Sequence, residues 1–289
     1  MTSTSSEALS TPRVPSNRPG PLALARQGLR ELIDRRRLIR YLVGADLKRT
    51  HADTIFGQLW WVFDPLLQMA VYVVLVSVIF QRATPDYPLF LFAAVLPWKW
   101  FATTLNDATQ SVVNRQSLIR QIQFPKIVLP MAAVSAGTVS FAIGLIALGI
   151  VYLFFLHRLT PWVLLIPVIA VVQYVFTLAL GIALGALNTF YRDVGNVMRH
   201  IVRLWFYLSP GLWTLNGEYA FIPQDHWARP ILMLNPFAHL FEAYRAVTWG
   251  MGPPDWLGLL GLLVVSVVLL GGSVALFKRV EPAFARILS

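Results

Sequence analysis

Residues 127–156 read IVLPMAAVSAGTVSFAIGLIALGIVYLFFL, a long stretch without a single charged side chain. A helix needs about 20 mostly apolar residues to cross the hydrocarbon core of a bilayer. This stretch therefore predicts a transmembrane helix. Residues 161–187 and 256–277 have the same character and predict two more.

The composition of the whole chain agrees with a membrane protein. Of its 289 residues, 56% are hydrophobic and only 13% are charged, and the mean hydropathy is +0.61. A soluble domain carries about 25% charged residues, so too few charges remain here to cover a globule. The composition also excludes disorder of the whole chain, and the lack of cysteine excludes disulfides and cysteine-ligated metal sites. We predict an all-α integral membrane protein.

A fourth segment, residues 61–80, also passes this test, although it holds an aspartate and a proline near its start. Two more segments are weaker: residues 88–101 are short and contain a lysine, and residues 201–215 contain an arginine and a Ser-Pro-Gly break. Residues 231–247 are interrupted by Asn-Pro and by several charges, so we expect a re-entrant or interfacial helical segment there. The prediction is six transmembrane helices.

The positive charges determine the predicted orientation. Lysine and arginine near spans are retained in the cytoplasm, and six spans place nineteen of the 24 on the side of the N-terminus. Both termini are therefore expected in the cytoplasm, and the net charge of +10 indicates orientation rather than nucleic-acid binding. Residues 1–20 lack the apolar region of a signal peptide and predict a disordered tail.

Residues 21–56 predict an arginine-rich, partly amphipathic segment that lies along the membrane surface. One interpretation is a plain anchor held by anionic lipids, at roughly 1 kcal/mol per basic residue. The other is direct contact with an anionic, lipid-linked ligand, because the guanidinium fork suits phosphate. The candidate side chains for such a contact or gate are Arg35, Arg36, Arg37, Arg40, Lys48, Arg49 and His51.

The sequence lacks the motifs of an enzyme or of an ATPase. It has no G-x-x-x-x-G-K-[ST] phosphate loop and no HExxH or GxSxG motif, and its five histidines do not show metal-ligand spacing. Charge within the predicted spans is sparse, which disfavours ion coupling. We therefore expect no catalytic site, metal or cofactor in this chain, and we expect the energy for any transport to come from a partner.

Short motifs between the predicted spans occur in a characteristic order. They are DLKRTH (46–51) before LWWVFDP (59–65), NRQSLIRQIQFPK (114–126), FYRDV (190–194), SP (209–210) and NPF…YR (235–245). Over roughly residues 40–280 they resemble the ABC-2 type permeases that export polysaccharides and polyol phosphates, such as O-antigen, teichoic acid or galactan.

The resemblance implies a homodimer of six-span subunits in a bacterial plasma membrane, with a channel at the dimer axis. It also implies two copies of a separate subunit that hydrolyses ATP with Mg²⁺. The expected cargo is a polysaccharide on a polyprenyl diphosphate lipid, moved from the cytoplasm to the outer leaflet. The expected divisions are a tail (1–20), interfacial and gate helices (21–56), the membrane domain (57–280) and a cytoplasmic end (281–289).

Three other functions are compatible with parts of the sequence. The first is an ABC-2 exporter of a drug or a small lipid, which needs no wide channel. The second is a lipid-linked sugar transferase or phosphatase, for which Asp46, His51 and Asp53 would have to supply the acid–base chemistry. The third is a purely structural scaffold.

Residues 114–124 predict a short cytoplasmic helix with one apolar side, which Pro125 stops. The resemblance makes it the segment that couples to the ATPase; otherwise it is a solvated loop. The FYRDV loop is a second expected contact, or else holds an ordinary charge pair. The residues assigned to coupling are Asn114, Arg115, Leu118, Ile119, Arg120, Phe124, Pro125, Lys126, Arg192 and Asp193.

Aromatic side chains are frequent near the predicted span ends, as in the aromatic belt of membrane proteins. A carbohydrate channel also needs flat apolar faces along which sugar rings can slide. The residues that we place near such a path are Tyr72, Phe80, Trp205, Phe206, Tyr207 and Trp213. The Gly181-x-x-x-Gly185 pair is expected to serve close helix packing.

Overall fold

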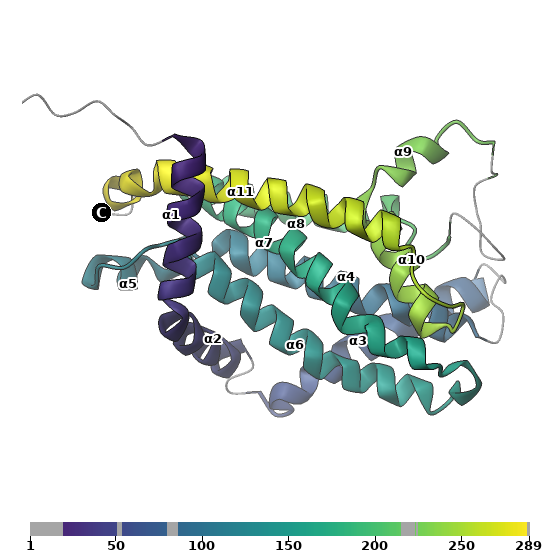
Figure 1. The fold of residues 1–289 in the computed structure, drawn as a ribbon. Helices are drawn as coiled ribbons and strands as arrows, with labels where there is room; N and C mark the ends of the chain where they lie inside the picture. The colour runs from purple at the N-terminus through teal and green to yellow at the C-terminus, as the bar shows by residue number, and fades with distance from the viewer. Residues whose placement is uncertain (1–19, 51–53, 80–85, 215–222, 224, 288–289) are drawn as a thin grey trace, which may run out of the picture.

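The computed structural model describes residues 20–50, 54–79, 86–214, 223 and 225–287 (Figure 1). Every regular element in these ranges is a helix, which confirms the predicted all-α class. Five described segments are long and apolar enough to cross a bilayer. They are Gly57–Val78, Tyr87–Gln110, Val128–Tyr152, Pro161–Phe190 and Trp256–Phe284.

The described chain forms five long helices and several short ones. The long helices are α3 (Trp60–Val74), which a π-helical turn continues over Leu75–Ile79, α4 (Tyr87–Gln110), α6 (Val128–Tyr152), α7 (Ile166–Phe190) and α11 (Trp256–Ile287). The short helices are α1 (Pro21–Asp34), α2 (Arg36–Thr50), α5 (Gln116–Gln121), α8 (Asp193–Leu208), α9 (Arg229–Met233) and α10 (Pro236–Thr248). Single turns of 3₁₀ helix lie at Gly57–Leu59, Val113–Arg115, Leu156–Arg158 and Pro161–Leu165.

Two predicted spans have different bounds in the structure. The span expected over 88–101 continues as α4 to Gln110, because Thr103, Asn106, Asp107 and Gln110 share one open side while Thr104 and Thr109 are buried with the rest of the helix. The span expected over 201–215 is α8, which ends at Leu208 just before Pro210. The 16 residues of α8 rise about 24 Å, against about 30 Å for a hydrocarbon core. The number of six crossings therefore stays a prediction.

The segment expected to be re-entrant, 231–247, is helical but short. It contains α9 and α10, and the 13 residues of α10 rise only about 20 Å. Asn235 caps α10, since its side chain accepts a hydrogen bond from the Phe237 N–H at 3.0 Å. Pro236 follows at the first helical position, where no N–H is needed.

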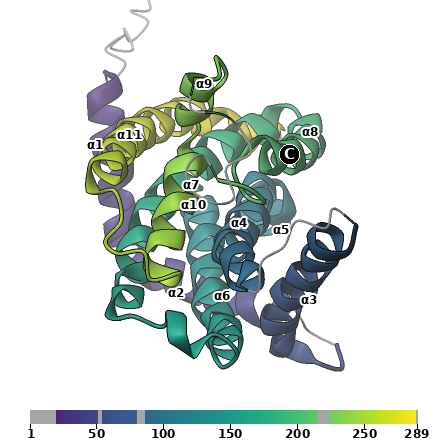
Figure 2. The ribbon, with the colours of Figure 1, turned by 90° about the vertical axis from the view of Figure 1, so that its right-hand side faces the viewer.

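Helix α4 is the centre of the bundle. It packs against α3, α6, α7, α8 and α10, and Figure 2 shows it between α3 and α8 on one side of the molecule. Its middle is surrounded by aromatic rings in edge-to-face and tilted contacts, which favour packing beyond simple burial. The cluster comprises Trp98, Phe101, Phe176, Trp205, Phe237 and Phe241.

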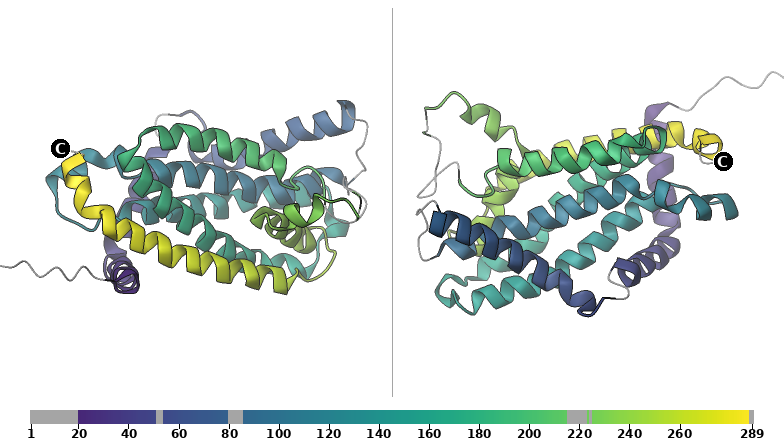
Figure 3. Two further views of the ribbon diagram at one scale, coloured as in Figure 1. Left: turned by 90° about the horizontal axis from the view of Figure 1, so that it is seen from above. Right: turned by 180° about the vertical axis from the view of Figure 1, so that it is seen from behind.

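The two ends of the bundle differ (Figures 1 and 3). One carries α1, α2, α5 and the C-terminal end of α11, and we call it the α5 end; the other carries α9 and α10, and we call it the α10 end. The basic segment is two helices with a break at Arg35, and these pack on α11 and α6. The α1 crossing requires Gly28, because a Cβ there would lie 2.3 Å from Val274 Cγ1.

Candidate functional site

A cavity of about 600 Å³ lies toward the α5 end, between α3, α4 and α6. This volume is within the range of about 300–1,000 Å³ that is typical of ligand sites. Charged side chains reach the cavity from five parts of the chain. They are Asp46 and Arg49 of α2, Asp64 of α3, Lys99 and Asp107 of α4, Arg115, and Arg199 of α8.

Two ion pairs cross this cavity. Lys99 Nζ lies 3.2 Å from Asp64 Oδ2 and joins α4 to α3. Arg115 pairs with Asp46 and joins the turn after α4 to α2. Asp107 is exposed and forms no ion pair with any described residue. The hydropathy of this span falls off before Asp107, so the sequence pattern does not mark Asp107 as a site residue.

Polar side chains continue from this cavity along α4, α3 and α8, and we call this set of residues the trough. Its floor is the only side of α4 that is not buried, and α3 and α8 flank that side (Figure 2). The trough comprises Lys99, Thr103, Asn106, Asp107 and Gln110 on α4, Asp64, Gln68 and Tyr72 on α3, and Asn196, Arg199, His200, Arg203 and Tyr207 on α8. On each helix these residues recur every three or four positions, so they share one face.

The flanking helices have a second, apolar face. On α8 the exposed residues away from the trough include Val197, Ile201, Leu204 and Leu208. On α3 they include Leu67, Val71 and Val74. Lipid accepts such surfaces, whereas charged side chains in a membrane normally face protein or a water-filled space. The two faces of α8 and α3 therefore separate a lipid side from a polar side.

The predicted channel aromatics divide into two groups. Tyr72 and Tyr207 lie at the trough, where Tyr72 stacks on Phe206 with ring centroids 5.6 Å apart. Phe206 is only 3% exposed, and Trp205 packs in the aromatic cluster with its Nε1–H donating to Asn235 Oδ1 at 3.1 Å. In one subunit these two rings pack behind the trough, because α8 turns this side toward α4, and their assignment to the channel stays a prediction. Phe80 lies outside the described residues.

The arginine-rich helices place only one predicted residue in the cavity. Arg49 lines it, whereas Lys48 does not, although both are exposed at the end of α2. The arginines around the break between α1 and α2 are also exposed and do not line it; they are Arg35, Arg36, Arg37 and Arg40. The structure therefore does not bring the predicted gate set together at one point. His51 and Asp53 lie outside the described residues.

The predicted coupling segment protrudes from the α5 end (Figure 1). Its helix, α5, ends at Gln121 rather than at 124, and the chain then runs extended to Pro125. Leu118 and Ile119 pack on the apolar cluster beneath, and Phe124 is buried at 8% exposure, so these three hold the segment in place. Of the residues predicted for coupling, those left exposed are Asn114 and Arg120, together with Arg192 and Asp193 where α8 begins.

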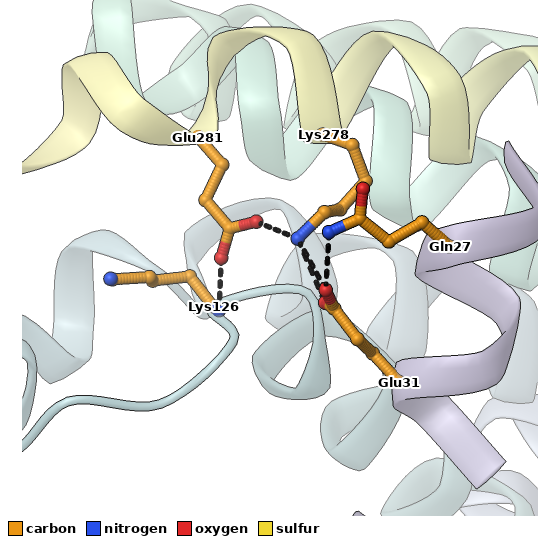
Figure 4. A network of polar contacts seen from close by, with 5 residues as sticks. All are labelled: Gln27, Glu31, Lys126, Lys278 and Glu281. Atoms are coloured by element: carbon orange, nitrogen blue, oxygen red, sulfur yellow. Dashed lines mark hydrogen bonds and ion pairs between the residues drawn. The ribbon is translucent and has the colours of Figure 1, made fainter. Parts of the chain in front are cut away.

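A polar junction joins this segment to both ends of the chain (Figure 4). Lys278 Nζ on α11 lies 2.8 Å from Glu31 Oε2 on α1 and 2.6 Å from Glu281 Oε2. Glu281 Oε1 accepts the backbone N–H of Lys126 at 2.5 Å. Lys126 was assigned to coupling, and its backbone takes part here. No sequence pattern predicts the junction, in which the bonded residues Glu31 and Lys278 are 247 positions apart.

At the α10 end, the SP and NPF…YR motifs meet. Arg245 is fully buried and donates to the carbonyls of Pro210, Gly211 and Trp213 at 2.7, 2.6 and 3.0 Å. Its guanidinium also lies 3.9 Å from the centre of the Phe90 ring. Arg245 thereby satisfies three backbone carbonyls of the turn that follows α8. Trp213, predicted as a channel aromatic, contributes its backbone to this clamp.

Comparison with known proteins agrees with this architecture. The profile of the family described as "ABC-2 type transporter" matches residues 37–249. An "O-antigen export system permease protein RfbA" from Myxococcus xanthus is 34% identical over 262 residues, covering 89% of this chain and 97% of that protein. Two proteins of the same name from Klebsiella pneumoniae are 28% and 26% identical, and each covers 87% of this chain. The chain therefore belongs to the ABC-2 type transporter family.

Proposed function

We propose that this chain is the permease subunit of an exporter that moves a polysaccharide on a polyprenyl diphosphate lipid from the cytoplasm to the outer leaflet. The observation that carries the proposal is the polar trough, a long surface rich in hydroxyl, amide and charged groups within an apolar bundle. Such a surface suits an extended, hydroxyl-rich polymer. The names of the three relatives, all O-antigen export permeases, point the same way.

A second copy of the chain is proposed to close the trough. In one subunit the trough is open on one side, and polar groups turned to hydrocarbon cost several kcal/mol each. A homodimer in which two troughs face each other removes that cost and forms a channel at the dimer axis. The lipid-facing sides of α3 and α8 remain outside.

The energy is proposed to come from two copies of a separate ATP-hydrolysing subunit, which uses ATP and Mg²⁺. They would bind at the α5 end, where α5 protrudes and where Arg120, Arg192 and Asp193 are exposed. The junction at Lys278 supports this location, because it connects the segment after α5 to both α1 and α11.

The α5 end is proposed to face the cytoplasm of a bacterial plasma membrane, with both termini on that side. Most of the lysines and arginines belong to segments that are predicted on the side of the N-terminus, and the positive-inside rule assigns that side to the cytoplasm. The exposed arginines of α1 and α2 would bind anionic lipid headgroups, and Arg49 at the cavity would meet the substrate. The proposed divisions at 1–20, 21–56, 57–280 and 281–289 follow this assignment.

The proposal is tested by deleting the gene from its own host and restoring it on a plasmid. We expect surface polysaccharide to fall at least tenfold on deletion, polymer on its lipid carrier to accumulate inside, and both to recover on complementation. Normal surface polymer without internal accumulation would overturn the proposal. Transport of a short amphiphile by the purified complex, with no ATPase response to lipid-linked glycan, would favour a drug or lipid exporter instead.

A further inference from the structure

We propose that the cavity between α3, α4 and α6 is a saccharide-binding site, one in each subunit, in which Asp107 accepts hydrogen bonds from sugar hydroxyls. The inference rests on the proposed function, because it assumes that a glycan enters the trough. It adds a defined site with a chemical preference, namely a neutral sugar residue rather than the diphosphate of the carrier.

The charge of the cavity favours a neutral ligand. Three carboxylates and four cations line it, so its net charge is small. Lys99 and Arg115 are already paired with Asp64 and Asp46. These pairs leave Arg49 and Arg199 beside the carboxylate of Asp107, and a diphosphate would bring several negative charges close to that carboxylate. A neutral sugar residue brings no such repulsion.

The polar groups on α4 are arranged to bind hydroxyls. Thr103, Asn106 and Asp107 follow at positions i, i+3 and i+4, so they share one face of the helix. A carboxylate only accepts hydrogen bonds, so the ligand of Asp107 must donate them. Asn106 Nδ2 donates to the Ala102 carbonyl at 2.7 Å, while its buried Oδ1 has no donor among the described residues. Sugar hydroxyls can donate to the exposed carboxylate of Asp107.

Aromatic rings provide the apolar part of the site. Trp61 and Trp100 line the cavity, and Trp100 is stacked on Phe141 with ring centroids 4.4 Å apart. Trp100 is 4% exposed, and its buried Nε1–H has no acceptor among the described residues. Pyranose rings have apolar C–H faces that pack against indole, and the partly exposed Trp61 offers such a ring, whereas the buried Trp100 forms the wall behind it. One site therefore offers both polar and apolar contacts.

Photo-crosslinking in living cells tests the proposal with the whole transporter. The photoreactive residue benzoylphenylalanine replaces Thr103 in the cavity or Ile146, which is 58% exposed on the opposite side of α6. The probe is the host's own surface polysaccharide, detected on the crosslinked chain by its antibody and by glycosidase digestion. We expect a glycan adduct at position 103, at least tenfold more than at position 146.

Asp107→Ala, combined with the crosslinker at 103, is expected to lower the adduct about tenfold, whereas Asp34→Ala on the exposed end of α1 should not change it. If Asp107→Ala reduces the amount of chain in the membrane, Asp107→Asn replaces it, with an expected loss of about threefold. Equal yields at 103 and 146, lipid adducts alone, or no effect of either Asp107 variant would overturn the site. Because polymer export is scored in the same cells, loss of the site is distinguished from failure of the proposed function.

Discussion

Helices α3 and α4 lie side by side, and their hydropathy and burial run in opposite directions. The most apolar stretch of the α3 segment has a mean hydropathy of 1.8, and 11% of its residues are buried. The corresponding stretch of α4 has a mean hydropathy of 1.3, and 78% of its residues are buried. In water the more apolar helix would be the interior one. In a bilayer the apolar face turns to lipid, which is as apolar as leucine, and the interior is selected by packing and polar contacts.

Within α4 the same contrast separates two halves. From Tyr87 to Trp98 the helix is almost entirely buried, and aromatic rings pack around its middle. From Lys99 onward one side opens to the trough and carries the polar residues that lower its hydropathy. The first half thus holds the bundle together, and the second half offers a surface to a ligand.

The largest expected effect comes from the aromatic core of α4. Trp98→Ala should lower the free energy of unfolding by about 3–5 kcal/mol, because it leaves a cavity among Phe206, Phe237 and Phe241. Leu67→Ala, at 57% exposure on α3, should change it by less than about 0.5 kcal/mol. Unfolding of the purified chain in detergent measures both. Equal losses would break the contrast between the two helices.

The contact between α4 and α6 gives the next effect. A Cβ at Gly137 would lie 1.9 Å from Thr104 Oγ1, so Gly137→Ala should cost about 2 kcal/mol. Gly149, on the same helix, has nothing within 4 Å, and Gly149→Ala should instead stabilise α6 by about 0.5–1 kcal/mol. The same unfolding measurement should therefore show a loss of stability for Gly137→Ala and a gain for Gly149→Ala. A gain for both would contradict the tight contact between α4 and α6.

A smaller effect is expected at the junction on the α5 end. Lys278→Met removes the cation between Glu31 and Glu281 and should destabilise the chain by about 1 kcal/mol. It should also reduce substrate-stimulated ATP hydrolysis by the assembled transporter, since the link from Lys126 to α1 is lost. Arg279→Met, at the exposed neighbouring position, is the control. Unchanged ATP hydrolysis in both variants would limit the junction to a structural role.

The smallest effect concerns the start of α4. Arg158 donates to Asp86 at 3.0 and 2.5 Å and holds the pKa of that carboxyl below its ordinary value. The Asp86 carboxylate therefore stabilises the folded chain at every pH above about 4, the pKa of an aspartate in the unfolded chain. This stabilisation is lost as the pH falls through the lower pKa that Asp86 has in the folded chain. Unfolding measured from pH 6 down to pH 3 should show a steeper loss for the native chain than for Asp86→Asn. Parallel curves would contradict this contribution.

Sequence alone predicted the fold class, the three strong spans and the order of the family motifs, because these depend on composition and local pattern. It ended the second span too early, since Asn106 and Asp107 lower the hydropathy of a helix that is buried on its other sides. It did not show that Phe206 is buried behind α8, because an aromatic pattern does not separate core from surface. The Arg245 clamp and the Lys278 junction join residues far apart in sequence, which one sequence does not reveal.

The central claim is that the trough forms the aqueous path of the polymer. The accessibility of single cysteines to a thiol reagent tests it most directly. The chain has no cysteine, so each variant carries one thiol. In membranes containing the transporter, Gln68→Cys and Thr103→Cys should react with a charged thiol reagent at least tenfold faster than Leu67→Cys and Val71→Cys, and polymer synthesis should slow their reaction. Equal rates on the two faces, or rates that polymer synthesis does not change, would contradict the account.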